Sequence, residues 1–278
     1  MRFGFKTSPQ DTTWASMLEV WRAADDIEVF ESGWTSDHFY AMHGAGLSRA
    51  RLEGWMTLTA LAQATRRLRL GTLVTGIHYR HPAVLANMAA TVDVISGGRL
   101  ELGIGTGWNE QESAAYGIEL GTPRQRSDRL EEACRVLSGL LSAQPTTTFS
   151  GTYYQLTAAR CEPKPVQQPL PICIGGSGER RTLRTAARFA QHWNFDTGTP
   201  AQFARAREVL YQHCADASRD PADVLLSAQV RFTGDPARTA EDAAAFAAAG
   251  AHLVITYLPA PHDPAVLEPL GTELAKLP

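Results

Sequence analysis

Short apolar runs alternate along this chain with longer segments in which apolar residues recur every three or four positions. The short runs are typical of strands, and the longer spacing is typical of helices. The runs that predict strands are 3–7, 34–37, 68–74, 99–104, 170–175, 192–195, 224–232 and 251–258. The segments that predict helices between and after them are 14–30, 52–65, 82–96, 179–190, one beginning at 200, 240–249 and 264–277.

Eight strands that alternate with helices predict an α/β protein in which right-handed strand–helix units close into a (β/α)8 barrel, the TIM barrel. We expect one domain over residues 1–278 because no second composition class appears. Residues 110–169 break the alternation with helices at 110–116 and 126–141 and a hairpin near 149–154. This segment is too small for a core of its own, so it is expected to be an insertion between the fourth and fifth strands.

Composition narrows the classes of function. Apolar residues make up 44% of the 278 residues and the formal net charge is −3, so nothing favours nucleic acid or an anionic membrane surface as a partner. The four cysteines form no CxxC pair and predict reduced, packed thiols. The chain opens with a strand, and no apolar run reaches membrane-spanning length. We therefore expect a cytoplasmic protein.

The predicted strand 99–104 ends in glycines that an aromatic and an amide residue follow. Gly105 and Gly107 leave the backbone bare and permit positive φ, so a flat or anionic ligand can lie against the main chain. Trp108 and Asn109 add an indole face and an amide. Ligand sites of parallel barrels form at this end of the strands, although a strand followed by a tight turn explains the stretch equally well.

Asp37 and His38 follow the second predicted strand, so both side chains are expected at the barrel mouth. A histidine beside an acid is a usual pair for proton handling near neutral pH, and the alternative is a capped strand end with a surface histidine. His78 and His81 have an HxxH spacing without a third ligand at zinc-site spacing, so no metal is predicted. We expect these two histidines to be rim or capping residues.

The chain passes from the fifth predicted strand directly into a helix through Gly175, Gly176, Ser177 and Gly178. Successive backbone N–H groups at a helix N-terminus form a nest for anions, and phosphate is its natural guest. The pattern has neither the Walker nor the Rossmann spacing, and a plain helix cap would need only one glycine. Asn194 ends the sixth strand on the same rim. Together the strand ends predict a planar, phosphorylated cofactor lying across the barrel mouth.

Four segments resemble the bacterial luciferase-like monooxygenase superfamily, in the branch that mostly uses the deazaflavin coenzyme F420. They are residues 31–39, 68–76, 79–110 and 170–194, which together span most of residues 1–195. The resemblance implies a (β/α)8 barrel with the cofactor ring at its C-terminal mouth. Beyond these segments the chain is similar to the family only in its alternation of strands and helices.

The resemblance also implies a cis peptide bond, not preceding proline, near Leu73 and Val74 at the end of the third strand. This bulge would support the back face of the ring, and Asp37 and His38 would lie beside the ring. The further contacts that it implies with the ring, its side chain and its phosphate are Thr75, Gly107, Asn109, Gly175, Gly176, Ser177 and Gly178. Members are often homodimers that use the early helices, and we expect the same here.

One departure from the family pattern bears on the substrate. The F420-dependent sugar-phosphate dehydrogenases have a glutamate where this chain has Trp108, and we find no cluster of basic residues for a sugar phosphate. The expected substrate is therefore a less polar small molecule.

The leading hypothesis is an oxidoreductase that moves a hydride between coenzyme F420 and a small organic substrate. In this hypothesis His38, oriented by Asp37, exchanges the proton that accompanies the hydride. Both residues are therefore expected to be replaceable by alanine with loss of turnover and little loss of stability.

Three alternatives stay open. The first is a two-component monooxygenase that uses FMN and molecular oxygen together with a reductase partner. Only the F420 tail needs an extended basic track, which Arg180, Arg181 and Arg184 would begin. The others are a flavin-binding protein without turnover and an aldolase-type barrel, for which Lys6 is the one lysine at a strand end.

Overall fold

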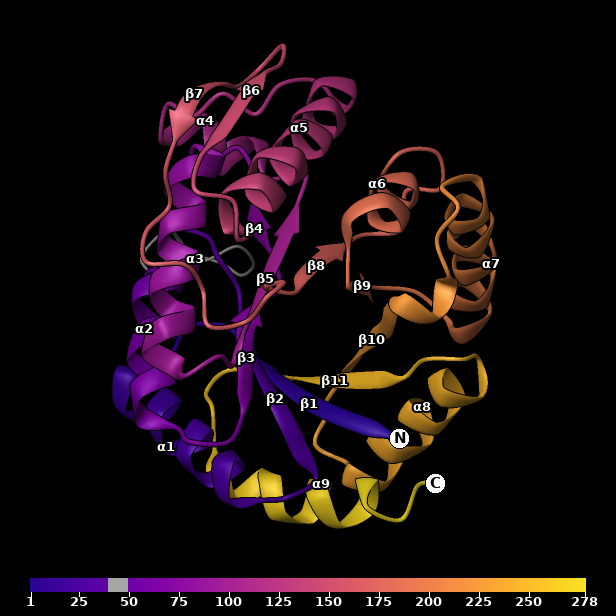
Figure 1. The fold of residues 1–278 in the computed structure, drawn as a ribbon. Helices are drawn as coiled ribbons and strands as arrows, with labels where there is room; N and C mark the ends of the chain where they lie inside the picture. Colours follow the sequence, from indigo (N-terminus) through magenta and orange to yellow (C-terminus); the bar gives the residue numbers. More distant parts are fainter. Residues whose placement is uncertain (40–49) are drawn as a thin grey trace.

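The computed structural model describes residues 1–39 and 50–278, so most of the predicted functional loop 38–51 lies outside the described residues. The described chain forms a closed barrel of parallel strands with helices around it (Figure 1). Helices α1 to α3 cover one side of the barrel, and α6 to α8 cover the other. The predicted (β/α)8 barrel is confirmed. The two ends of the chain lie together, because the Met1 amino group donates to the Pro278 carbonyl at 3.0 Å.

The barrel strands all run in the same direction. In chain order they are β1 (Arg2–Thr7), β2 (Phe30–Thr35), β3 (Arg69–Thr72), β4 (Thr75–Gly76), β5 (Leu100–Gly105), β8 (Ile172–Gly175), β9 (His192–Phe195), β10 (Leu225–Arg231) and β11 (Leu253–Leu258). Both β3 and β4 pair with β5, so they are two pieces of one barrel strand. The peptide bond between Leu73 and Val74, which separates the two pieces, is cis. This is the bond that the family resemblance implies.

The outer helices and short 3-10 turns follow the strands. They are α1 (Trp14–Asp26), α2 (Gly54–Ala64), α3 (Pro82–Ser96), α6 (Thr182–Phe189), α7 (Pro200–Asp216), η1 (Pro221–Asp223), α8 (Pro236–Ala248), η2 (Pro264–Val266) and α9 (Leu267–Leu274). Local signals place several boundaries. Gly97 ends α3 at φ +68°, a conformation that glycine adopts without a steric cost. Thr199 and Gln202 form a reciprocal capping box at the predicted start of α7.

The predicted insertion is smaller than 110–169. It contains α4 (Glu110–Ala115), α5 (Pro123–Leu141), β6 (Thr147–Ser150) and β7 (Gln155–Ala159). Helix α5 packs against α3 and α6, so it takes the place of the fourth barrel helix. The extra elements are therefore α4 and the predicted hairpin, which β6 and β7 form as an antiparallel pair.

The second strand begins earlier than predicted. The helix expected to reach residue 30 ends at Asp26, and β2 starts at Phe30. Apolar residues at this boundary fit a helix as well as a strand, and only the packing of Phe30 against Phe5, with ring centroids 5.8 Å apart, decides for the strand. Asp37 and His38 consequently lie in the loop beyond β2.

The apolar core has two parts. The larger part lies between the strands and the helices, and the smaller part fills the barrel with Trp34, Leu73, Cys173, Leu253 and Ile255. The four cysteines are free and buried, as predicted. Over residues 1–39 and 50–278, no helix combines the length and apolar character that a membrane span requires.

Candidate active site

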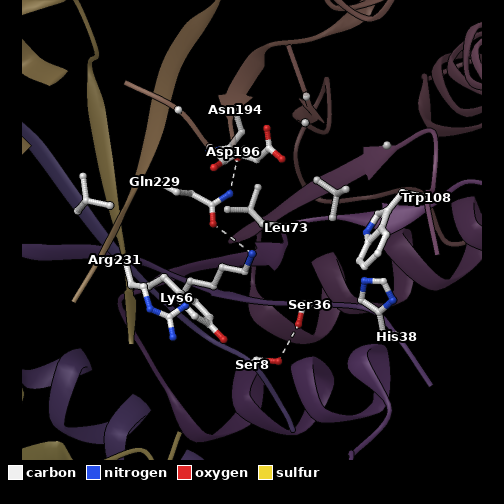
Figure 2. A pocket seen from close by; sticks show the side chains of 18 of the residues that line it. Lys6, Ser8, Ser36, His38, Leu73, Trp108, Asn194, Asp196, Gln229 and Arg231 are labelled. Atoms are coloured by element: carbon white, nitrogen blue, oxygen red, sulfur yellow. Dashed lines mark hydrogen bonds between the residues drawn. The ribbon is translucent and has the colours of Figure 1, made fainter. Parts of the chain in front are cut away.

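A cavity of about 920 Å³ opens at the carboxyl ends of the barrel strands (Figure 2). Ligand sites of this fold form at that end. The predicted site residues that line it are His38, Leu73, Val74, Gly105, Gly107, Trp108, Gly175, Gly176 and Asn194. The predicted site residues outside the lining are Asp37, Thr75, Asn109, Ser177 and Gly178. The structure therefore brings most of the predicted set together around one space.

One wall of the cavity is Val74 packed between two glycines. A Cβ on Gly105 would lie 2.7 Å from Val74 Cγ2, and a Cβ on Gly175 would lie 2.8 Å from Val74 Cγ1. Atoms of a packed interior do not approach so closely, so Val74 occupies its place only because both neighbours lack a side chain. The wall is apolar and has no protruding side chains. It fits the face of a planar cofactor ring.

His38 is held by a carboxylate from another part of the chain. Its Nδ1 lies 2.8 Å from Oε2 of Glu112 on α4 and 3.1 Å from the Tyr79 hydroxyl, which also donates to Glu112. The second carboxylate oxygen of Glu112 accepts the Phe39 N–H at 2.5 Å. Because Glu112 accepts from Nδ1–H, the other ring nitrogen, Nε2, is the one that can exchange a proton with a ligand.

Electrostatics keep the Glu112 carboxylate charged. Burial raises the pKa of Glu112, but hydrogen bonds from His38, Tyr79 and the Phe39 N–H outweigh burial and lower that pKa to about 2. Burial and the adjacent Glu112 raise the pKa of Tyr79, which therefore stays a neutral donor. Sequence reasoning missed Glu112. The available signal was its place one helical turn after Asn109, at the start of a short helix.

Asp37 does not orient His38, and that part of the prediction is wrong. The buried Asp37 carboxylate pairs with the Arg80 guanidinium at 2.5 and 3.2 Å, and Arg80 also binds Glu53 at 2.6 Å. Burial raises the pKa of Asp37, and Arg80 opposes that shift. Asp37 and His38 therefore have different partners although they are adjacent in the sequence. Its contacts connect the loop after β2 to α2 and the start of α3.

Two predicted cofactor residues have structural partners next to the cavity. Thr75 Oγ1 accepts the Trp55 indole N–H at 2.9 Å and lies 3.1 Å from Thr72 Oγ1. Asn109 caps α4, because its side chain accepts the Glu112 N–H at 3.0 Å. Asn109 thereby positions the carboxylate that holds His38. A direct contact of Thr75 or Asn109 with a cofactor stays a prediction.

The glycine run does not pass directly into a helix. Helix α6 begins at Thr182, three residues later than predicted, because the Leu183 N–H bonds back to the Gly178 carbonyl at 3.1 Å in an intervening turn. The Gly176 N–H donates to the Asn194 carbonyl at 3.0 Å and so already has a partner. Phosphate binding by Ser177 and Gly178 stays a prediction.

Two of the three arginines expected to begin a basic track make contacts within the protein. Arg181 binds Asp128 at 2.5 Å, and Arg184 lies 3.6 Å from Glu131. Both acids belong to α5, so these arginines join neighbouring outer helices. They therefore give little support to a track for the F420 tail.

The two HxxH histidines have separate roles. His81 Nδ1 accepts the Ala83 N–H at 3.2 Å and caps α3, as predicted. His78 lies beneath Gly107, where a Cβ would come within 2.3 Å of the imidazole ring, and burial lowers the pKa of His78 to about 4. In the described parts of the chain, no group of three or more His, Cys, Asp and Glu residues is arranged to hold a metal ion.

Lys6 lines the cavity at some distance from His38 (Figure 2). Its Nζ donates to Gln229 Oε1 at 3.1 Å, and Gln229 Nε2 donates to Asn194 Oδ1 at 2.8 Å. Burial lowers the pKa of Lys6 to about 8. The sequence signal was the alternation in β1, which places Lys6 on the face opposite the buried Phe3 and Phe5.

The luciferase-like monooxygenase family model matches residues 1–275. A protein of Microbacterium testaceum named F420-dependent glucose-6-phosphate dehydrogenase is 31% identical over 280 residues, which cover 99% of this chain and 80% of that protein.

Solved structures show the same fold at lower sequence identity. An F420-dependent secondary alcohol dehydrogenase in complex with an F420-acetone adduct superposes with a TM-score of 0.87 at 19% identity, covering 99% of this chain and 97% of that one. The monooxygenase RslO1 from Streptomyces bottropensis has a TM-score of 0.82 at 18% identity, with 99% of both chains covered. The barrel, its cis peptide bond and the match over residues 1–275 agree: this chain belongs to the luciferase-like monooxygenase family.

Proposed function

We propose that this protein is an oxidoreductase that transfers a hydride between coenzyme F420 and a small organic substrate. The observation that carries the proposal is that the smooth Val74 wall and the imidazole of His38 line the same cavity. The relative of 31% identity over 99% of this chain is named for the same cofactor, which supports F420 over other planar cofactors. Val74, Gly105 and Gly175 would hold the deazaflavin ring.

The protein's residues supply orientation and proton handling. The deazaflavin, when bound, supplies the carbon that accepts or donates the hydride. His38 holds the accompanying proton at Nε2, while the charged Glu112 accepts from Nδ1–H and stabilises the imidazolium that forms when His38 takes up a proton. The Trp108 ring packs edge-on beside the imidazole, with its centroid 5.8 Å from that of His38 (Figure 2). Its indole reduces the access of water to the transferred proton.

The proposal is tested by titrating the purified protein with F420 and, separately, with FMN while following cofactor fluorescence. Tight binding of F420 with weak binding of FMN is the expected result. Preference for FMN, followed by oxygen consumption with a flavin reductase, would move the protein to the monooxygenase class. If the protein binds F420 but converts no compound in a screen of alcohols, aldehydes and enones, it is a binding protein without turnover.

We also propose that the protein is a homodimer that associates through α2 and α3. Met56 on α2 is 73% exposed, and Val84 and Val94 on the adjacent α3 are 55% and 43% exposed. Apolar residues gathered on neighbouring helices indicate a surface that a partner covers. Light scattering should give twice the monomer mass for the wild type and the monomer mass for Met56→Glu/Val84→Glu. Ala201→Glu, which changes an exposed residue of α7 on the other side of the barrel, is the control and should remain dimeric.

A further inference from the structure

Three neighbouring strands place two cations around one aromatic ring at the Lys6 end of the cavity. In the barrel register, Lys6 of β1 and Arg231 of β10 both pair with Tyr257 of β11. Lys6 Nζ lies 5.7 Å from the Tyr257 ring centroid, and Arg231 Cζ lies 5.2 Å from it. All three side chains line the cavity, and Figure 2 shows Lys6 and Arg231 together on the side away from His38.

Neither cation has a carboxylate at ion-pair distance within residues 1–39 and 50–278. The acids nearest in the lining are Asp196 and Asp242. Asp242 is already paired with Arg238 at 3.1 Å. Asp196 attracts Lys6 from a longer distance, but burial outweighs this attraction and lowers the pKa of Lys6. Lys6 and Arg231 thus have only Asp196 to balance two positive charges among the described lining acids, so this end of the cavity has a surplus positive charge.

A series of hydrogen bonds that begins at Gln229 also holds Lys6 in place. Gln229 is oriented by Asn194, whose Nδ2 donates to Ser227 Oγ at 2.7 Å. Ser227 Oγ lies 2.6 Å from His192 Nε2, and His192 Nδ1 lies 2.8 Å from Glu101 Oε2. The Glu101 carboxylate accepts from His192, so each donor in the series points away from Lys6 and the Gln229 carbonyl oxygen faces the ammonium. The Lys6 ammonium is therefore held by a positioned acceptor and still has N–H donors for a ligand. In this it differs from a solvated surface lysine.

We propose that Lys6 and Arg231 bind an oxyanion of the substrate, a carboxylate or a phosphate, at the opposite end of the cavity from His38. The proposal rests on the proposed oxidoreductase function, because it names the substrate class of the same site. Among the described residues Lys6 is half-buried without an ion-pair partner, which is costly, and a bound anion would offset that cost. The proposal departs from the expectation of a less polar substrate, because it pairs two basic residues whose strands lie more than 200 residues apart in the sequence.

The test compares each anion with its neutral counterpart, benzoate with benzamide and glucose 6-phosphate with glucose, by calorimetry on the F420-loaded and the cofactor-free protein. At least one anion should bind about tenfold or more tightly than its counterpart, as expected for charge-assisted hydrogen bonds. Lys6→Met should remove that preference and Arg231→Met should reduce it, while both variants keep the wild-type melting temperature within a few degrees. Lys276→Met, on the exposed C-terminal segment, is the matched control and should keep the full preference.

Equal affinities for anion and neutral counterpart in both pairs, or a preference that survives Lys6→Met, would overturn the proposal. The F420 tail is the other source of an oxyanion. A Lys6→Met variant that loses affinity for F420 but not for a deazaflavin without the phosphate tail would assign the cations to the cofactor and equally overturn the substrate role. If the wild type does not bind F420, the proposed oxidoreductase function is wrong. The titration of the cofactor-free protein would still show whether Lys6 and Arg231 bind an anion.

Discussion

Glu112 and His38 are 74 positions apart, yet a hydrogen bond of 2.8 Å joins Glu112 Oε2 to His38 Nδ1. The carboxylate reaches the imidazole because Asn109 starts α4 at the barrel mouth. This pair, rather than the adjacent Asp37 and His38, is the proton-handling unit that we propose.

Replacing Glu112 with glutamine should lower kcat about 100-fold, because an amide keeps only one acceptor oxygen for the donors that the carboxylate now satisfies. The affinity for F420 should stay within about twofold. Steady-state kinetics and a fluorescence titration measure the two quantities. Glu110→Gln, an exposed neighbour on the same helix, is the control. A His38→Ala/Glu112→Gln double variant that is far slower than His38→Ala alone would show that Glu112 does not act through His38.

Replacing Asp37 with alanine should lower the free energy of unfolding by about 2 kcal/mol, because the largely buried Arg80 would lose one of its two carboxylate partners and keep only Glu53. This reverses the expectation, drawn from the adjacency of Asp37 and His38, that the change leaves stability intact. Urea denaturation gives the measurement. An Asp37→Ala/Arg80→Met double variant should recover part of the loss, and a single variant as stable as the wild type would contradict the assigned role.

Stability should fall as the pH drops from about 4.5 to about 2 because of Glu101. Burial raises the pKa of Glu101, but His192 and Arg69 outweigh burial and lower it to about 2 in the folded protein, below the unfolded value of 4.5. The folded state therefore favours the carboxylate, so its contribution of up to about 3 kcal/mol is complete above pH 4.5 and is lost as the pH falls through 2. Unfolding free energies between pH 2 and 7 should depend less on pH in Glu101→Gln than in the wild type. Equal slopes would be the contrary result.

Replacing Gly105 with alanine should weaken F420 binding about tenfold, because the new Cβ would lie 2.7 Å from Val74 Cγ2 and push Val74 into the cavity. Fluorescence titration measures the affinity, and thermal denaturation monitors folding. The matched variant is Gly105→Ala/Val74→Ala, which removes the methyl groups that clash and should restore part of the affinity. Unchanged affinity in the single variant would mean that the ring does not lie on this wall.

The barrel and much of the cavity lining could be predicted from local patterns along the chain. Alternating strands and helices leave few ways to close a core, and the glycines before Trp108 and at 175–178 mark strand ends from local pattern alone. The capping residues Pro82, Gly97 and Thr199 act within one helical turn, which is why their effects were readable along the chain.

Which charged residues meet depends on the folded barrel. Glu112 reaches His38 from α4, Arg80 takes Asp37 away from it, and Lys6 joins Arg231 because β1 and β10 both flank β11. These contacts depend on barrel closure and register, which bring together residues that no local spacing relates. Adjacency in sequence paired Asp37 with His38, but in the folded protein Arg80 binds Asp37 and Glu112 binds His38.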